Sequence, residues 1–306
     1  MTLYRLTIEL TAPLGTPLAG ATLFGQMCWL KREADGEAAL VDWLADPGRL
    51  WRLSDGFPHG YLPKPLCHPR SLSREDLKDH KERKQRLFIA RDPWLRHRAA
   101  WNEFAVPNDA FRKDTTRMRH IAHNVVHRHG RGTLETGGLF FLDEDWRFAS
   151  GEEGGSDPLV DLYIEAGEPR DAVKGLVKEL GEAGFGRDAS TGRGRWKVRE
   201  IVEDRELAEG PGARRMSLSR GVLTPETMQD ALWRVEPHFG RAGAQVALTG
   251  ASPFKRPVLL TRPGATFRPA GEGLFGRWIT DVHPERPEIG LNGLHIAIPF
   301  NEAEAT

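Results

Sequence analysis

The sequence has few cysteines, no long hydrophobic run and no net charge, and each shortage excludes a class of protein. Among its 306 residues, Cys28 and Cys67 are the two cysteines, and they form neither a disulfide framework nor a metal-finger pattern. No window approaches the roughly 18–20 apolar residues that span a bilayer. The first residues lack the apolar core of a signal peptide, so we expect a reduced, cytoplasmic protein. Basic and acidic residues number 43 each, which excludes a uniformly basic nucleic-acid coat but allows a locally basic groove.

Familiar catalytic and metal-binding patterns are also missing. The sequence contains no Gly-x-Ser-x-Gly and no His-Glu-x-x-His motif. His120, His123 and His127 could ligate a metal on a helix, but the β-branched residues among them favour a strand, on which His120 and His123 face opposite ways. Their segment also lacks an acid to complete a zinc set, so we expect no metal and no cofactor. The histidines then either flank arginines on an RNA-facing strand, which we favour, or include His120 or His127 as the acid or base of a ribonuclease.

The charges that are present are distributed unevenly. Residues 70–131 hold sixteen Lys and Arg against eight Asp and Glu, whereas residues 143–168 hold nine acids and one base. Opposite charge on neighbouring segments indicates two surfaces with different partners, although solvated faces would give the same pattern. Trp94 and Trp101 lie among the basic residues, where they either stack on bases or fill a helical core.

The order of elements predicts an α+β fold made of two ferredoxin-like (RRM-like) domains. Alternating apolar residues indicate a strand over 3–11, and a helix follows with Thr22 as its N-cap. A strand over 159–164, a helix from Pro169 to Gly181, a glycine-rich loop and a strand around Trp196 repeat the βαβ pattern. The first domain therefore covers residues 1–203, with a long insertion at about 50–156.

Within the insertion we expect an irregular proline-rich stretch at 54–69, a charged helix at 72–91 and a hairpin at about 121–142. The second domain would cover residues 204–306. Its expected strands are residues 244–249, 257–262, 274–281 and 294–298.

The glycine-rich loop is the most informative local feature. It is neither a P-loop nor a dinucleotide fingerprint, because it lacks Gly-Lys-Ser/Thr and runs from a helix into a strand. Glycines would let backbone N–H groups approach a phosphate chain, while arginines add charge and hydroxyls add donors. The alternative is a mobile connector. The candidate RNA-binding residues of this loop are Gly184, Gly186, Arg187, Ser190, Thr191, Gly192, Arg193, Gly194 and Arg195.

Two further segments carry candidate binding residues. In the expected hairpin, arginines that can grip phosphates lie beside an amide that can read a base edge. The RNA-binding candidates there are Arg117, Arg119, His120, His123, Asn124 and Arg128. In the proline-rich stretch, Phe57, Tyr61 and Leu62 are expected to be exposed as a rigid anchor for a partner protein, unless they fill the chain's own core. The acidic stretch 143–168 would offer that partner complementary charge.

Thr22-Leu-Phe-Gly-Gln-Met-Cys-Trp29 is similar to a "D-T-L-F-G-x-x-x-W" helix start, and the loop from Ser54 to Pro65 is similar to an "S-D-A-F-P…L-P-K-P" loop. These stretches resemble motifs of one family, the fourth subunit of the type III-A CRISPR Csm complex in the RAMP superfamily. The hairpin from His123 to Phe140 resembles "R-N-x-I-D-R…T-G-T…G-x-L-F". Phe254-Lys-Arg-Pro257 resembles the "Y-K-P" strand, and the glycine-rich loop also matches. Ala21, His123 and His127 depart from the family pattern.

The resemblance implies a non-catalytic subunit that caps the 5′ handle of the CRISPR RNA (crRNA). It also implies binding to the large signalling subunit and to the neighbouring backbone RAMP subunit. Lys64 and Lys255, which lie within the matching motifs, join the RNA-binding candidates on this basis. Two alternatives stay open: a RAMP-type endoribonuclease that processes CRISPR repeat RNA with His120 or His127, and a scaffold that binds only proteins.

Overall fold

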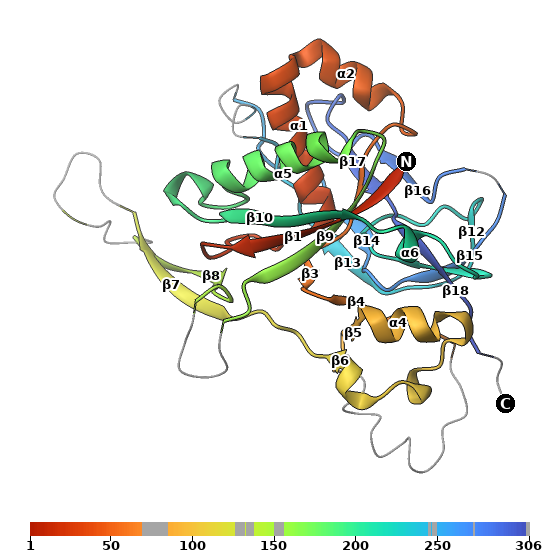
Figure 1. The fold of residues 1–306 in the computed structure, drawn as a ribbon. Coiled ribbons are helices and arrows are strands. Elements are labelled where there is room, and N and C mark those ends of the chain that lie inside the picture. Colours follow the sequence, from red (N-terminus) through yellow and green to blue (C-terminus); the bar gives the residue numbers. More distant parts are fainter. Residues whose placement is uncertain are drawn as a thin grey trace.

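The computed structural model describes residues 1–68, 85–125, 132, 138–149, 156–243, 246, 250–271 and 273–303, and the statements below concern these residues. They form helices and several small antiparallel sheets (Figure 1). The hairpin of β7 and β8 projects from the body at one side of Figure 1, next to the end of β1 and the start of β10.

The largest sheet has five strands in the order β10-β1-β9-β2, with β3 also paired to β9. All of its pairs are antiparallel. Helix α1 (Gly20–Asp35) lies between β1 and β2 in sequence, and α5 (Arg170–Ala183) lies between β9 and β10. This order of strands and helices is the ferredoxin-like plan expected for the first half. The strands are β1 (Thr2–Leu10), β2 (Arg52–Leu53), β3 (Phe57–Pro58), β9 (Leu159–Ala166) and β10 (Trp196–Glu203).

Alternation along β1 explains how the sheet is covered on both sides. Leu6 and Ile8 are fully buried with residues of α1 and α5 in one apolar core, and Figure 1 shows both helices on the same side of the sheet. Leu3, in the opposite phase, joins a second core with residues of the insertion and of the C-terminal strands. Helix α1 begins at Gly20 rather than at the expected cap Thr22, because the Gly20 N–H donates to the Asp55 carboxylate at 3.0 Å. Helix α2 (Glu37–Ala45) follows α1.

The insertion contains more regular structure than its prolines predict. Strand β4 (Tyr61–Pro63) pairs with β5 (Phe88–Ala90), which also pairs with β6 (Phe111–Arg112). The expectation that residues 54–69 are irregular is therefore wrong for the strand residues 57–58 and 61–63, whereas residues 64–68 are irregular as expected. Residues 88–90 form a strand instead of ending the helix expected at 72–91, and residues 69–84 lie outside the described residues. The helical elements are α4 (Arg91–His97) and three 3-10 turns, η1 (Arg98–Ala100), η2 (Glu103–Ala105) and η3 (Asn108–Ala110).

The residues predicted to anchor a partner protein lie mostly in the hydrophobic core of the chain. Phe57 is 2% exposed and Leu62 is fully buried, both in the second core, because β3 and β4 pair with β9 and β5. The expectation that they form an exposed docking loop is wrong. Tyr61 is half-buried, with the Arg112 guanidinium over its ring. Trp94 and Trp101 are also buried, 5.0 Å apart between ring centroids, and therefore do not stack on bases.

The hairpin is confirmed as strands β7 (Met118–Asn124) and β8 (Leu139–Asp145), paired from Met118–Asp145 to Asn124–Leu139. The turn between them, including His127 and Arg128, lies outside the described residues.

The C-terminal half is built mostly from short strands. A four-stranded sheet has the order β12-β15-β11-β18, and two further pairs are β13-β14 and β16-β17. A second ferredoxin-like domain is not confirmed, since α6 (Arg205–Ala208) is the one helix with defined bounds in the described part of this half. The strands are β11 (Arg214–Ser217), β12 (Met228–Leu232), β13 (Val235–His238), β14 (Val258–Thr261), β15 (Thr266–Pro269), β16 (Gly276–Ile279), β17 (Leu291–Leu294) and β18 (Ala297–Phe300).

Strands β14 and β16 match two of the four expected ones. The strand expected at 294–298 is divided between β17 and β18. Most of the fourth, 244–249, lies outside the described residues. The division at residues 203 and 204 stays a prediction, and the second core contains residues from both sides of it. None of the described helices is long and apolar enough to cross a membrane.

Candidate RNA interface

The glycine-rich loop between α5 and β10 closes tightly at its base. The Phe185 N–H donates to the Gly194 carbonyl at 2.9 Å, and the Gly194 N–H donates to the Pro13 carbonyl at 2.8 Å. Gly194 has φ +68°, and a Cβ there would lie 2.0 Å from the Phe185 oxygen. Only glycine fits such a position. The base of the loop is therefore a packed structure rather than a loose connector.

The outer part of the loop is open. It forms a 3-10 turn, η4 (Ala189–Thr191), in which Ser190 and Thr191 are exposed. At Gly192, with φ +93°, no atom lies within 4 Å of where a Cβ would be. A ligand can therefore approach the backbone at Gly192 without meeting protein.

Most backbone N–H groups of the loop already have acceptors within the chain. Gly186 donates to the Gln26 side chain and Arg187 to the Thr16 hydroxyl, at 3.3 and 2.9 Å. The backbone N–H groups of Thr191, Gly192 and Arg193 donate to carbonyl oxygens within the loop. The N–H groups of these residues are therefore committed to the fold, and a backbone cradle for phosphate, as expected from the glycines, stays a prediction for residues 188–190 alone. The guanidinium groups and the exposed hydroxyls are better placed to meet an anion.

The structure brings this loop against the hairpin. Arg187 Nη2 donates to the Asp143 carbonyl at 2.5 Å, and Arg193 Nε donates to Glu144 Oε1 at 2.8 Å. A backbone bridge between Leu14 and Asp145 fastens the same strand, β8, to the turn that follows β1. We call this meeting of residues 184–195 with β7 and β8 the loop–hairpin junction. It joins the two segments in which most of the RNA-binding candidates were expected.

Strand β7 presents its candidates mostly to solvent. Arg119 is exposed, with its guanidinium carbon 5.0 Å from the centre of the Trp146 ring. Asn124 is exposed at the strand end, and Arg117 is half-buried. The His120 side chain is 78% exposed, and its Nδ1 lies 2.5 Å from Asp143 Oδ1. Arg119 thus lies beside an aromatic ring, a pairing that proteins use to bind single-stranded nucleic acid. Asn124, five residues further along the strand, points to the other face of the hairpin.

The sequence interpretation missed the carboxylates of the junction. His123 Nε2 lies 3.9 Å from Glu144 Oε1, and the ring stacks on Phe140. His123, Glu144 and Asp188 bring ligand atoms within 4.8 Å of one another. However, Arg193 and Arg187 already pair with these two carboxylates at 2.8 and 3.3 Å, and a metal ion would compete with both guanidinium groups. The acidic residues 143–145 are visible in the sequence. They would have indicated this cluster of carboxylates only if their pairing opposite residues 118–120 had been known.

Three of the predicted RNA-binding residues take no part in the ion pairs and hydrogen bonds between the loop and the hairpin. Lys64 pairs with Glu103 at 3.1 Å. Lys255 is half-buried and donates to the Gly290 carbonyl at 2.8 Å, and burial lowers its pKa. Arg195 is exposed, and its Nη1 donates to the Glu182 carbonyl at the end of α5. Arg195 keeps most of its surface available, whereas the two lysines are held by other segments.

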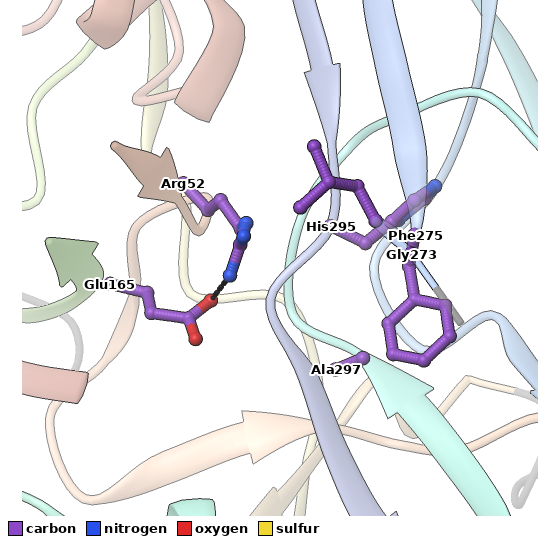
Figure 2. A pocket seen from close by; sticks show the side chains of 7 residues that line it. Arg52, Glu165, Gly273, Phe275, His295 and Ala297 are labelled. Carbon is purple, nitrogen blue, oxygen red and sulfur yellow. Dashed lines mark hydrogen bonds and ion pairs between the residues drawn. The ribbon is translucent and has the colours of Figure 1, made fainter. Parts of the chain in front are cut away.

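A small pocket of about 110 Å³ lies between the first sheet and the C-terminal strands (Figure 2). Arg52 and Glu165 form an ion pair at 2.5 Å on one side, and Phe275, His295 and Ala297 line the other. Burial lowers the pKa of His295 to about 4. The neutral ring can accept from the Ser217 hydroxyl and donate to the Val222 carbonyl, at 2.7 and 3.1 Å. His295 therefore serves to hold three C-terminal segments together.

Comparison with known proteins gives a likeness of fold. No family model and no curated protein matches the sequence. Among solved structures, a chain of the "Csm1-Csm4 cassette in complex with cA4" superposes with a TM-score of 0.60 at 13% identity, covering 99% of each chain. A chain of the "Csm1-Csm4 cassette in complex with pppApA" superposes with a TM-score of 0.58 at 16% identity, covering 98% of this chain and 99% of that one.

A chain of the "Csm3-Csm4 subcomplex in the type III-A CRISPR-Cas interference complex" gives a TM-score of 0.54 at 14% identity, over 98% of this chain and 100% of that one. The chain therefore has, over nearly its whole length, the fold found in these Csm structures. This agrees with the family resemblance of its motifs.

Proposed function

We propose that this chain is a non-catalytic, RNA-binding subunit of a type III-A CRISPR effector complex. It caps the 5′ handle of the crRNA at the loop–hairpin junction. It also docks the large signalling subunit and the neighbouring backbone subunit. The observation that carries the proposal is the contact between the glycine-rich loop and the hairpin: Arg187 and Arg193 bond to Asp143 and Glu144 of β8, and β8 pairs with β7.

The chemistry of the junction supports RNA as its ligand. Arg119 is exposed on β7 and Asn124 is exposed at its end, on the other face of the hairpin. Arg195 is exposed at the end of the loop, and Ser190 and Thr191 add hydroxyl donors. The exposed guanidinium groups of Arg119 and Arg195 suit phosphates, because a guanidinium can make two parallel hydrogen bonds. The full-length likeness of fold to chains of Csm1-Csm4 and Csm3-Csm4 structures supports the same assignment.

Binding to labelled RNA that begins with the 5′ portion of the CRISPR repeat tests this function. We expect the full chain to bind this RNA with a marked salt dependence, because phosphate contacts release counterions. A high 260-to-280 nm absorbance ratio of the co-purified complex would show that RNA is retained. A complex that assembles without RNA would instead favour the protein-binding scaffold.

One observation favours an endoribonuclease as the second candidate. A carboxylate beside a histidine is the arrangement that orients an acid or base, and His120 lies 2.5 Å from Asp143. We nevertheless expect repeat RNA to stay intact with the purified chain, with or without divalent metal. Cleavage that disappears in His120→Ala, with RNA binding retained, would establish the enzyme instead.

A further inference from the structure

The hairpin of β13 and β14 carries large apolar side chains in solvent on one face. Val235, Pro237 and Phe239 recur at every second residue, and Leu259 lies opposite Pro237 in the register. Trp233 and Phe254 extend the set at its two ends. We call these six residues the apolar strip. Their exposed fractions reach 73% at Phe239, 63% at Leu259 and 50% at Trp233.

The other face of the same hairpin packs against its own chain. Glu236, between Val235 and Pro237, pairs with Arg220 at 2.5 Å and with Arg262 at 2.7 Å. His238 is half-buried, and burial lowers its pKa to about 4. Because strand side chains alternate, the inward face fixes the hairpin and leaves the apolar strip pointing outward. Scattered apolar residues are normal on a surface, but a continuous set of this size marks an interaction site.

The surroundings of the strip are basic. Of the five Lys and Arg in residues 233–243 and 252–262, Arg262 pairs with Glu236, Arg256 pairs with Asp281, and Lys255 is half-buried against the Gly290 carbonyl. The cations that border the strip are therefore the other two. Arg234 and Arg241 are exposed, and Arg241 lies over the Phe254 ring at 5.2 Å. Aromatic residues and arginine at the centre and rim are the composition of protein–protein contacts.

We infer that the apolar strip docks a neighbouring protein subunit whose own apolar patch is bordered by carboxylates. A second copy of this chain fits poorly, because a two-fold contact would place the arginines of one rim against those of the other. RNA fits less well, because Trp233, Phe239 and Phe254 could stack on bases but Val235, Pro237 and Leu259, which lie among them, offer no ring, so the strip is not a continuous stacking surface. The identification of the neighbour as a subunit of the effector complex depends on the proposed function.

Two variants of the full chain test the inference, each mixed with the purified large subunit and, separately, with the backbone subunit. Trp233→Ser with Leu259→Ser removes apolar surface. Arg234→Glu with Arg241→Glu reverses the rim charge without touching buried groups. We expect both variants to weaken binding to the same subunit at least tenfold, with unchanged binding to the other subunit and unchanged handle-RNA affinity and thermal stability. Val41→Ser, at a residue 60% exposed on α2, is the matched control and should change none of these.

The other outcomes separate this inference from the proposed function. Unchanged subunit binding by both variants would overturn the strip as a docking site, even if the wild-type chain binds RNA and assembles. Loss of RNA affinity alone would assign the strip to nucleic acid. A variant that abolishes self-association without affecting subunit binding would assign it to a second copy. If instead the strip variants lose subunit binding while the wild-type chain fails to bind RNA, the inference stands and the RNA proposal fails.

Discussion

The loop–hairpin junction and the apolar strip hold their side chains differently. At the junction, Arg187 and Arg193 are fixed by the carbonyl of Asp143 and the carboxylate of Glu144. On the strip, Trp233, Phe239 and Leu259 are at least half-exposed. Groups that already support the fold cannot be removed without loss of stability, whereas exposed groups can. Substitutions of the fixed residues of the junction should therefore lower stability and RNA affinity together, whereas those on the strip should affect partner affinity alone.

Gly194→Val should have the largest effect on the junction. The new Cβ would lie 2.0 Å from the Phe185 oxygen, at φ +68°. Left-handed backbone strain and overpacking together predict a loss of about 4 kcal/mol in the free energy of unfolding. Gly192→Val, at φ +93° with open space, should lose only about 1–2 kcal/mol and mainly lower RNA affinity. Urea unfolding followed by tryptophan fluorescence measures both, and equal losses would show that the base of the loop is not rigid.

Acid should destabilise the chain through His295, which is buried in the C-terminal half. Burial lowers the pKa of His295 from 6.5 to about 4. Because the unfolded state binds the proton more tightly, stability is complete above pH 6.5 and falls as the pH drops toward 4. The loss should be about 3 kcal/mol at most. Unfolding measured at pH 7, 5.5 and 4 should show this slope in the wild-type chain and a shallower one in His295→Gln. Identical slopes would mean that the ring is not held neutral.

Arg193→Ala should lower stability by about 2 kcal/mol, because it leaves the buried Glu144 carboxylate with fewer donors. Trp146 Nε1 still donates to Glu144 at 3.0 Å, which limits the loss. In a double-mutant cycle, adding Glu144→Gln to Arg193→Ala should restore part of the lost stability. Additive losses would show that the pair contributes nothing to the junction.

Arg195→Ala should have the smallest effect on stability, within about 0.5 kcal/mol, because this side chain is exposed. It should still weaken handle binding and make the salt dependence shallower by about one phosphate.

Substitutions of Arg128, which lies outside the described residues, should separate charge from geometry. Arg128→Lys should retain more RNA affinity than Arg128→Ala, because lysine keeps the positive charge but cannot make two parallel hydrogen bonds. Binding titrations at several salt concentrations distinguish these cases. An unchanged salt slope in Arg195→Ala would place this arginine away from RNA.

The first half of the fold could be predicted because its elements are long and periodic. Val173, Val177 and Leu180 mark the buried face of α5, and alternation marks β1. The C-terminal strands are mostly four residues long, too short for alternation to define their limits. Phe57 and Leu62 were assigned to the surface because prolines surround them. Their burial depends on pairing with β9 and β5, which lie far away in sequence.

The candidate site was predictable in its residue types but not in its pairing. The basic and glycine-rich segments are visible in the sequence, whereas the contacts of Glu144 and Asp143 depend on the register of β7 against β8. A shift of one residue would turn these side chains to the other face of the hairpin. Nothing local in the sequence fixes that register.

The most direct test of the central claim is a crosslink between the handle and the chain. The full chain is bound to repeat-derived RNA that carries 4-thiouridine at successive handle positions, irradiated, and digested for mass spectrometry. The account predicts crosslinked peptides from residues 117–124 and 186–195, which disappear when unlabelled handle competes. Crosslinks confined to residues 233–262, or spread evenly over the chain, would contradict it.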